Sequence, residues 1–160
     1  MTVSFTLNGR ARTYAGDPRS SLLEVLRETY RLTGAKDVCG EGFCGACMVQ
    51  IDGMPTTACL VPVGTLEGAD VRSIEGVGTE EQLNPVQQAS IDFDVVQCGM
   101  CFPGMVMTLT HFLQDNPQPT REDVKSALTG NICRCTGYER IIDAVMSLSL
   151  APKPLTEAQP

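Results

Sequence analysis

Residues 39–47 read Cys-Gly-Glu-Gly-Phe-Cys-Gly-Ala-Cys, and a fourth cysteine follows at position 59. Four residues separate Cys39 from Cys44, two separate Cys44 from Cys47, and eleven separate Cys47 from Cys59. A loop this short can wrap one compact metal centre with three thiolates, while a nearby strand supplies the fourth. Its glycines allow the left-handed backbone conformations that so tight a loop needs. The stretch therefore predicts a metal site held by sulfur.

Two kinds of metal centre use four thiolates. The first three cysteines have the spacing of plant-type [2Fe–2S] centres. Structural zinc usually takes its ligands from two separate, closely spaced pairs, so the iron–sulfur interpretation is favoured here. Residues 40–45 also match the dinucleotide-binding pattern G-x-G-x-x-G. The cysteines break the strand–turn–helix context which that pattern requires, so the match is spurious.

Four more cysteines lie in the second half of the chain. Cys98 and Cys101 form a C-x2-C pair, and Cys133 and Cys135 form a C-x-C pair. Each pair precedes a predicted helix, so the free N–H groups of two helix starts would face one anionic centre. Spacing alone leaves a four-cysteine zinc site open, and a redox dithiol at the C-x2-C pair is a weaker alternative.

Composition narrows the possible functions. Hydrophobic residues make up 42% of the 160 residues and charged residues 19%, as expected for a globular protein. The net charge of -7 argues against nucleic acid as a partner. No export signal or membrane-spanning run is apparent, so we expect a cytoplasmic protein without membrane insertion, in which eight cysteines indicate metal rather than disulfides. The single histidine, His111, excludes a Rieske centre and a two-cysteine, two-histidine zinc finger.

The hydrophobic periodicity changes from strand-like to helical along the chain. Asn8-Gly9 and Asp52-Gly53 predict hairpin turns, and a helix is expected to end at Gly34. The strands are predicted at 3–7, 10–15, 47–51, 56–61 and 71–74. Four helices are predicted at 85–95, 103–114, 121–128 and 138–150, with capping boxes beginning at Thr120 and Thr136.

These patterns predict an α+β fold with two domains. The first domain is expected at 1–76 and the second at 85–150. The polar, glycine-containing segment 77–84 would link them. The proline-rich residues 151–160 are expected to form a loose tail.

Three motifs together resemble the small iron–sulfur subunit of the xanthine oxidase family of molybdenum hydroxylases. Besides 39–47, they are Gln-Cys-Gly-Met-Cys-Phe-Pro-Gly at 97–104 and Gly-Asn-Ile-Cys-Arg-Cys-Thr-Gly-Tyr at 130–138. The family includes xanthine dehydrogenase, aldehyde oxidoreductase and carbon monoxide dehydrogenase, and the resemblance covers residues 1 to about 150. It implies a β-grasp ferredoxin-like domain followed by a four-helix domain, with one [2Fe–2S] cluster in each.

The resemblance also implies roles for individual residues. The cluster nearer the molybdenum would be bound by Cys98, Cys101, Cys133 and Cys135, and the distal cluster by Cys39, Cys44, Cys47 and Cys59. Gln97 and Cys135 would approach the pterin of the molybdenum cofactor. A large partner chain would hold that cofactor and a medium partner chain would hold FAD. This chain would relay single electrons and have no active site of its own; the alternative is a free-standing two-cluster carrier.

Four bulky apolar residues depart from the usual motifs of this family: Phe43, Met48, Met100 and Phe102. Such side chains beside a cluster exclude water and can shift its reduction potential. They can instead repack an interface between subunits, and this second interpretation is favoured.

Overall fold

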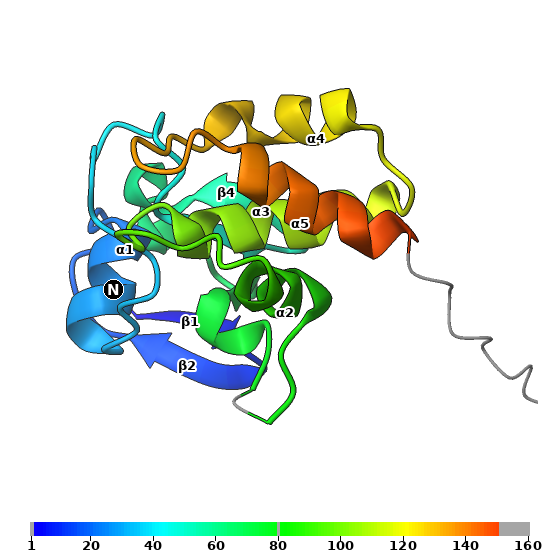
Figure 1. The fold of residues 1–160 in the computed structure, drawn as a ribbon. Coiled ribbons are helices and arrows are strands. Elements are labelled where there is room, and N and C mark those ends of the chain that lie inside the picture. The colour runs from blue at the N-terminus through cyan, green and yellow to red at the C-terminus, as the bar shows by residue number, and fades with distance from the viewer. Residues whose placement is uncertain (1, 80, 151–160) are drawn as a thin grey trace, which may run out of the picture.

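The computed structural model describes residues 2–79 and 81–150, so the predicted tail at 151–160 lies outside the described residues. The two halves of the chain form two units, each with its own hydrophobic core (Figure 1). A five-stranded sheet with a short helix makes up the first unit, and four helices make up the second. The fold is α+β with a β-grasp-like first unit, as predicted.

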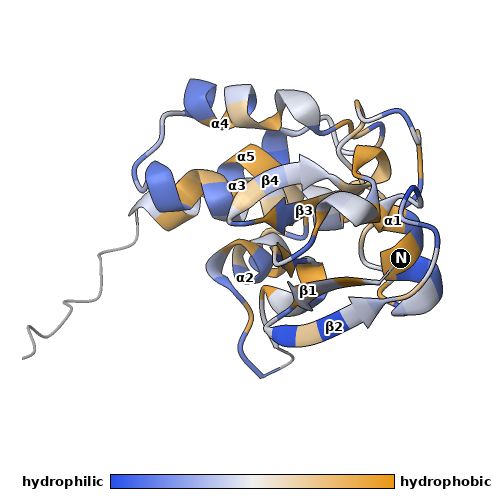
Figure 2. Cartoon of the chain, turned by 180° about the vertical axis from the view of Figure 1, so that it is seen from behind, coloured by the Kyte–Doolittle hydropathy of each residue, from blue (hydrophilic) through white to orange (hydrophobic). Residues whose placement is uncertain are grey.

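The sheet of the first unit has the order β2-β1-β5-β3-β4. Its strands are β1 (Val3–Leu7), β2 (Arg10–Tyr14), β3 (Met48–Ile51), β4 (Met54–Thr57) and β5 (Asp70–Arg72). β1 and β5 are parallel, and the other neighbours are antiparallel. Alternate residues of β1 enter the core beneath the helix, whereas the edge strand β2 is mostly exposed and carries hydrophilic residues (Figure 2).

Three predicted elements of the first unit differ in length from the observed ones. The helix comprises α1 (Leu22–Glu24) and a π-helical continuation, η1 (Val25–Thr29), and it ends early because Arg31 adopts a φ of 57°. The predicted return strand stops at Thr57 and continues as the 3₁₀ helix η2 (Ala58–Leu60). Cys59 therefore lies on this helix and not on a strand. The last strand is shorter and is followed by η4 (Ile74–Gly76).

The helices of the second unit are α2 (Pro85–Asp92), α3 (Phe102–Asp115), α4 (Arg121–Ala127) and α5 (Glu139–Leu150), with η5 (Leu128–Gly130) after α4. α3 lies against β3 and β4, while α2 and α4 pack on α5. α2 ends three residues earlier than predicted, because Asp94 has a φ of 47°. Ile74 and Val77 pack against the helical core, so the segment between the units takes part in that core. No helix within the described residues could span a membrane.

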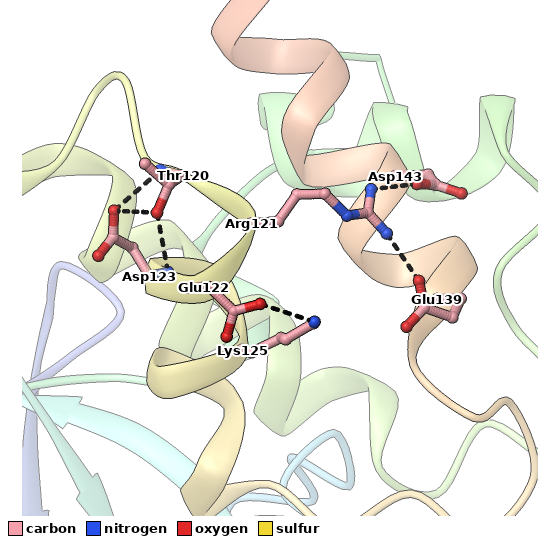
Figure 3. A network of polar contacts seen from close by, with 7 residues as sticks. All are labelled: Thr120, Arg121, Glu122, Asp123, Lys125, Glu139 and Asp143. Atoms are coloured by element: carbon pink, nitrogen blue, oxygen red, sulfur yellow. Dashed lines mark hydrogen bonds and ion pairs between the residues drawn. The ribbon is translucent and has the colours of Figure 1, made fainter.

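The predicted capping box at the start of α4 is present. The hydroxyl of Thr120 accepts a hydrogen bond from the backbone N–H of Asp123, and the Asp123 carboxylate accepts one from the backbone N–H of Thr120 (Figure 3). These bonds satisfy two backbone donors at the helix start and hold the pKa of Asp123 below its ordinary value.

The capping box predicted at Thr136 was wrong. The Glu139 carboxylate does not turn back to the backbone but accepts a hydrogen bond from Arg121, at 2.6 Å. Arg121 also donates to Asp143 at 2.5 Å (Figure 3). The guanidinium thereby joins the first turn of α4 to the first turns of α5, directly after the second pair of cysteines.

Candidate cluster-binding sites

The first set of cysteines surrounds one loop of the sheet domain. Cys39, Cys44 and Cys47 lie between η1 and β3, and Cys59 lies on η2. Cys44 and Cys47 are buried, whereas Cys39 and Cys59 are partly exposed. The three glycines of the loop, Gly40, Gly42 and Gly45, have φ values of 66°, 81° and 70°. Only glycine adopts such values at little cost, which is the conformational demand that the sequence predicted.

The second set joins the beginnings of two helices. Cys98 and Cys101 lie in the segment before α3, and Cys101 is the N-cap residue of that helix. Cys133 and Cys135 lie between η5 and α5. Cys133 is buried, while Cys98 and Cys135 are exposed with their sulfurs 3.5 Å apart. The fold thus brings together two pairs that are far apart in the sequence.

The sulfurs of both sets approach one another in twos. In the first set the Cys39 thiol interacts with Cys44, and Cys47 with Cys59. In the second set Cys98 interacts with Cys135, and Cys101 with Cys133. A two-iron cluster binds two cysteines at each iron. A zinc ion would instead gather four sulfurs at ~2.3 Å around one point.

No three His, Cys, Asp or Glu side chains of residues 2–79 and 81–150 are placed to bind one metal ion together. The pairwise arrangement of the thiols therefore fits a [2Fe–2S] cluster in each set better than it fits zinc.

Hydrogen bonds and burial divide the thiols by their proton affinity. The backbone N–H of Glu41, 3.4 Å from the Cys39 sulfur, is the main cause that lowers the pKa of Cys39 to about 6. Burial raises the pKa of Cys47 and of Cys101 to about 12. Buried thiols of this kind lose their protons when iron binds, because a metal ion takes the place of the proton on sulfur.

The loops that carry the two sets are in direct contact (Figure 1). The backbone N–H of Ile132 donates to the carbonyl of Cys44 at 2.9 Å, and the side-chain amide of Asn131 donates to the carbonyl of Gly45 at 3.3 Å. Gly104 of α3 packs on the same loop so closely that a Cβ there would lie 2.0 Å from the Gly45 oxygen. This junction holds the two cysteine sets at a defined separation.

Gln97 and Cys135 lie side by side with Cys98 in one small surface pocket. Both Gln97 and Cys135 are exposed, so a partner chain could reach them. Sequence reasoning missed Asn131, and it assigned no chemistry to Thr136 or Tyr138, all of which contact the cysteine loops. Their motif positions were visible, but their partners depend on how the loops fold together.

Comparisons with known proteins extend these observations. Residues 5–70 match a 2Fe-2S iron-sulfur cluster binding domain, and residues 73–146 match a [2Fe-2S] binding domain. The chain is 41% identical to the nicotinate dehydrogenase small FeS subunit of Eubacterium barkeri, over 91% of this chain and 92% of that protein. It is 46% identical to aldehyde oxidase 1 of Cavia porcellus over 89% of this chain, which spans only 12% of that oxidase.

A solved structure agrees with both matches. The crystal structure of quinoline 2-oxidoreductase from Pseudomonas putida 86 contains a chain with a TM-score of 0.89 and 40% sequence identity, covering 94% of each chain. The similarity therefore spans both units and both cysteine sets.

Proposed function

Because this chain belongs to the family of small [2Fe–2S] subunits of molybdenum hydroxylases, we propose that its eight cysteines hold the two clusters through which single electrons leave a molybdenum centre on a larger chain. The chain carries two [2Fe–2S]-binding domains and is the electron-transfer subunit of such an oxidoreductase, with catalysis on another subunit. When bound, each cluster accepts and releases one electron.

The ligand assignment rests on the pairing of the sulfurs. We assign Cys39, Cys44, Cys47 and Cys59 to one cluster and Cys98, Cys101, Cys133 and Cys135 to the other. Each set provides two adjacent pairs, as a cluster with two irons requires. The contact between the two cysteine loops supports a relay, because it brings the two sets close together through Cys44 and Ile132.

The exposed pocket at Gln97 and Cys135 is the proposed contact with the pterin of the molybdenum cofactor on the large subunit. A further subunit with FAD, or another acceptor, would take the electrons from the set in the sheet domain. A free-standing carrier is not favoured, because the relatives are subunits or segments of larger enzymes. Eight free cysteines suit a reducing compartment, which is the support for a cytoplasmic location.

Exposed apolar side chains lie around both sets, and we propose that partner chains cover them. Val38, Phe43 and Leu60 are 55%, 57% and 59% exposed beside the first set. Met100 and Ile132, beside the second set, are 44% and 48% exposed. Exposure at Phe43 and Met100 supports the interface interpretation of these two unusual residues. A third unusual residue, Phe102, packs against the helical core and so has an internal role.

The domain boundaries also remain a proposal: 1–76 for the sheet domain, 77–84 for the linker and 85–150 for the helical domain. The supporting observations are that η4 ends at Gly76 and that α2 starts at Pro85.

Low-temperature EPR of the reduced complex, with iron and sulfide determination, tests the central proposal. Two distinct S = ½ signals and about four iron atoms per chain are expected. A single signal, with Cys98, Cys101, Cys133 and Cys135 binding zinc or nothing, would refute the two-cluster assignment.

A further inference from the structure

Cys133 is held between two side chains of the turn that follows it. The Thr136 hydroxyl lies 3.1 Å from the Cys133 sulfur. The Tyr138 hydroxyl accepts a hydrogen bond from the backbone N–H of Cys133 at 2.8 Å. Cys133 is only 9% exposed, so water reaches this sulfur poorly and the two protein contacts dominate its surroundings.

The direction of the contact between Thr136 and Cys133 follows from the remaining hydrogen bonds. The backbone N–H of Tyr138 donates to the Thr136 oxygen at 3.2 Å, which uses one acceptor position of that hydroxyl. A metal-bound cysteine is a thiolate and has no proton to donate. The single proton of the Thr136 hydroxyl is therefore the one that points to sulfur.

Tyr138 keeps the turn in the shape that this contact needs. Its φ of 68° is left-handed, which a bulky residue adopts only when its surroundings hold it there. The ring packs against the helical core, and the hydroxyl donates to the carbonyl of Asn131 at 3.0 Å. Tyr138 thus closes the turn from 131 to 138 on both sides of Cys133.

We propose that Thr136 raises the reduction potential of the cluster in the helical domain by donating a hydrogen bond to the Cys133 thiolate, with Tyr138 as the positioning residue; this inference rests on the proposed function. Reduction adds negative charge to the cluster, and a hydrogen-bond donor at a ligand sulfur stabilises the more negative state. Among the described residues, no side-chain hydroxyl is hydrogen-bonded to a sulfur of the first set, where the backbone N–H of Glu41 donates to Cys39. The effect should therefore be confined to one cluster.

An EPR-monitored redox titration of the complex, purified with its partner chains, measures both cluster potentials in one sample. Thr136→Val removes the hydroxyl with little change of shape. It should disfavour reduction of one cluster about tenfold, or ~59 mV for a one-electron couple, and leave the other unchanged. Thr136→Ser keeps the hydroxyl and should restore the wild-type potential. Thr129→Val is the matched control, because the Thr129 hydroxyl bonds to the carbonyl of Ser126 and to no cysteine.

Two negative outcomes are distinguishable. Two signals with unchanged potentials in Thr136→Val would overturn this inference and leave the proposed function standing. A wild-type complex without a second cluster signal would overturn the proposed function itself. Should the valine prevent cluster binding, Thr136→Ala removes the same hydroxyl without a branched side chain, and the same decrease in potential is expected.

Discussion

Replacing Gly104 with alanine should force the helical domain away from the loop of the first cysteine set. The added Cβ would lie 2.0 Å from the carbonyl oxygen of Gly45 and 3.3 Å from Cα of Ala46. Non-bonded heavy atoms prefer a separation of about 3.5 Å, so the junction must open by ~1.5 Å. Both neighbours are backbone atoms, and neither can move aside as the end of a flexible side chain could.

The magnitude of this effect has two contributions. Overpacking of a well-packed contact costs about 1–3 kcal/mol. Loss of the buried hydrogen bond between Asn131 and Gly45 adds ~1 kcal/mol. A total of about 2–4 kcal/mol lowers the apparent Tm of a chain of this size by roughly 4–16 °C.

The assay is the loss of visible cluster absorbance on heating, together with the magnetic coupling between the two reduced clusters by EPR. Gly104→Ala should melt earlier, and its coupling should be weaker because the clusters lie further apart. Gly130→Ala is the matched control, since Gly130 has no positive φ and no atom within 4 Å of the position of its Cβ. An alanine variant at 104 that melts with the wild type and retains its coupling would refute the close junction.

Three further predictions concern single side chains. Cys59→Ser should reduce the iron content from about four to about two atoms per chain and abolish one EPR signal while the other remains; loss of both signals would contradict separate clusters. Arg121→Gln should lower the apparent Tm by no more than about 3 °C in low salt and by less in high salt, because the ion pairs with Glu139 and Asp143 are exposed; an equal decrease at both salt concentrations would argue against an electrostatic role. The pKa of Asp123 is lowered from 3.8 by the hydroxyl and backbone N–H of Thr120, so its stabilising effect is complete above 3.8 and is lost as the pH falls through the lower folded value; the stability advantage of wild type over Asp123→Asn, from urea unfolding at several pH values, should therefore shrink in acid and not grow.

The cysteine sets were predictable because their information is local. Cys39, Cys44 and Cys47 lie within one loop, and the glycines between them signal its backbone shape. The hairpins at Asn8-Gly9 and Asp52-Gly53 were likewise confirmed, since a two-residue turn is specified by its own residues.

The errors lie where distant contacts override a local pattern. Glu139 has the spacing of a capping-box residue, but Arg121 of another helix binds its carboxylate. Cys59 lies on a 3₁₀ helix because this segment turns towards α1, where the backbone N–H of Leu22 donates to the carbonyl of Val61. The contact of Asn131 with Gly45 joins residues far apart in the sequence, and no periodicity indicates such a pair.

The pairing of the sulfurs in the helical domain has a consequence for how the two domains depend on iron. Cys98 pairs with Cys135, and Cys101 with Cys133, so each iron would link the start of α3 to the segment before α5. Iron would close a long loop there, as a pair of disulfides does, and would restrict the unfolded chain most in this domain. In the sheet domain, Cys39 and Cys44 close only a short loop. A cell short of iron should therefore accumulate chains whose helical half is open to proteases while the sheet half is still folded.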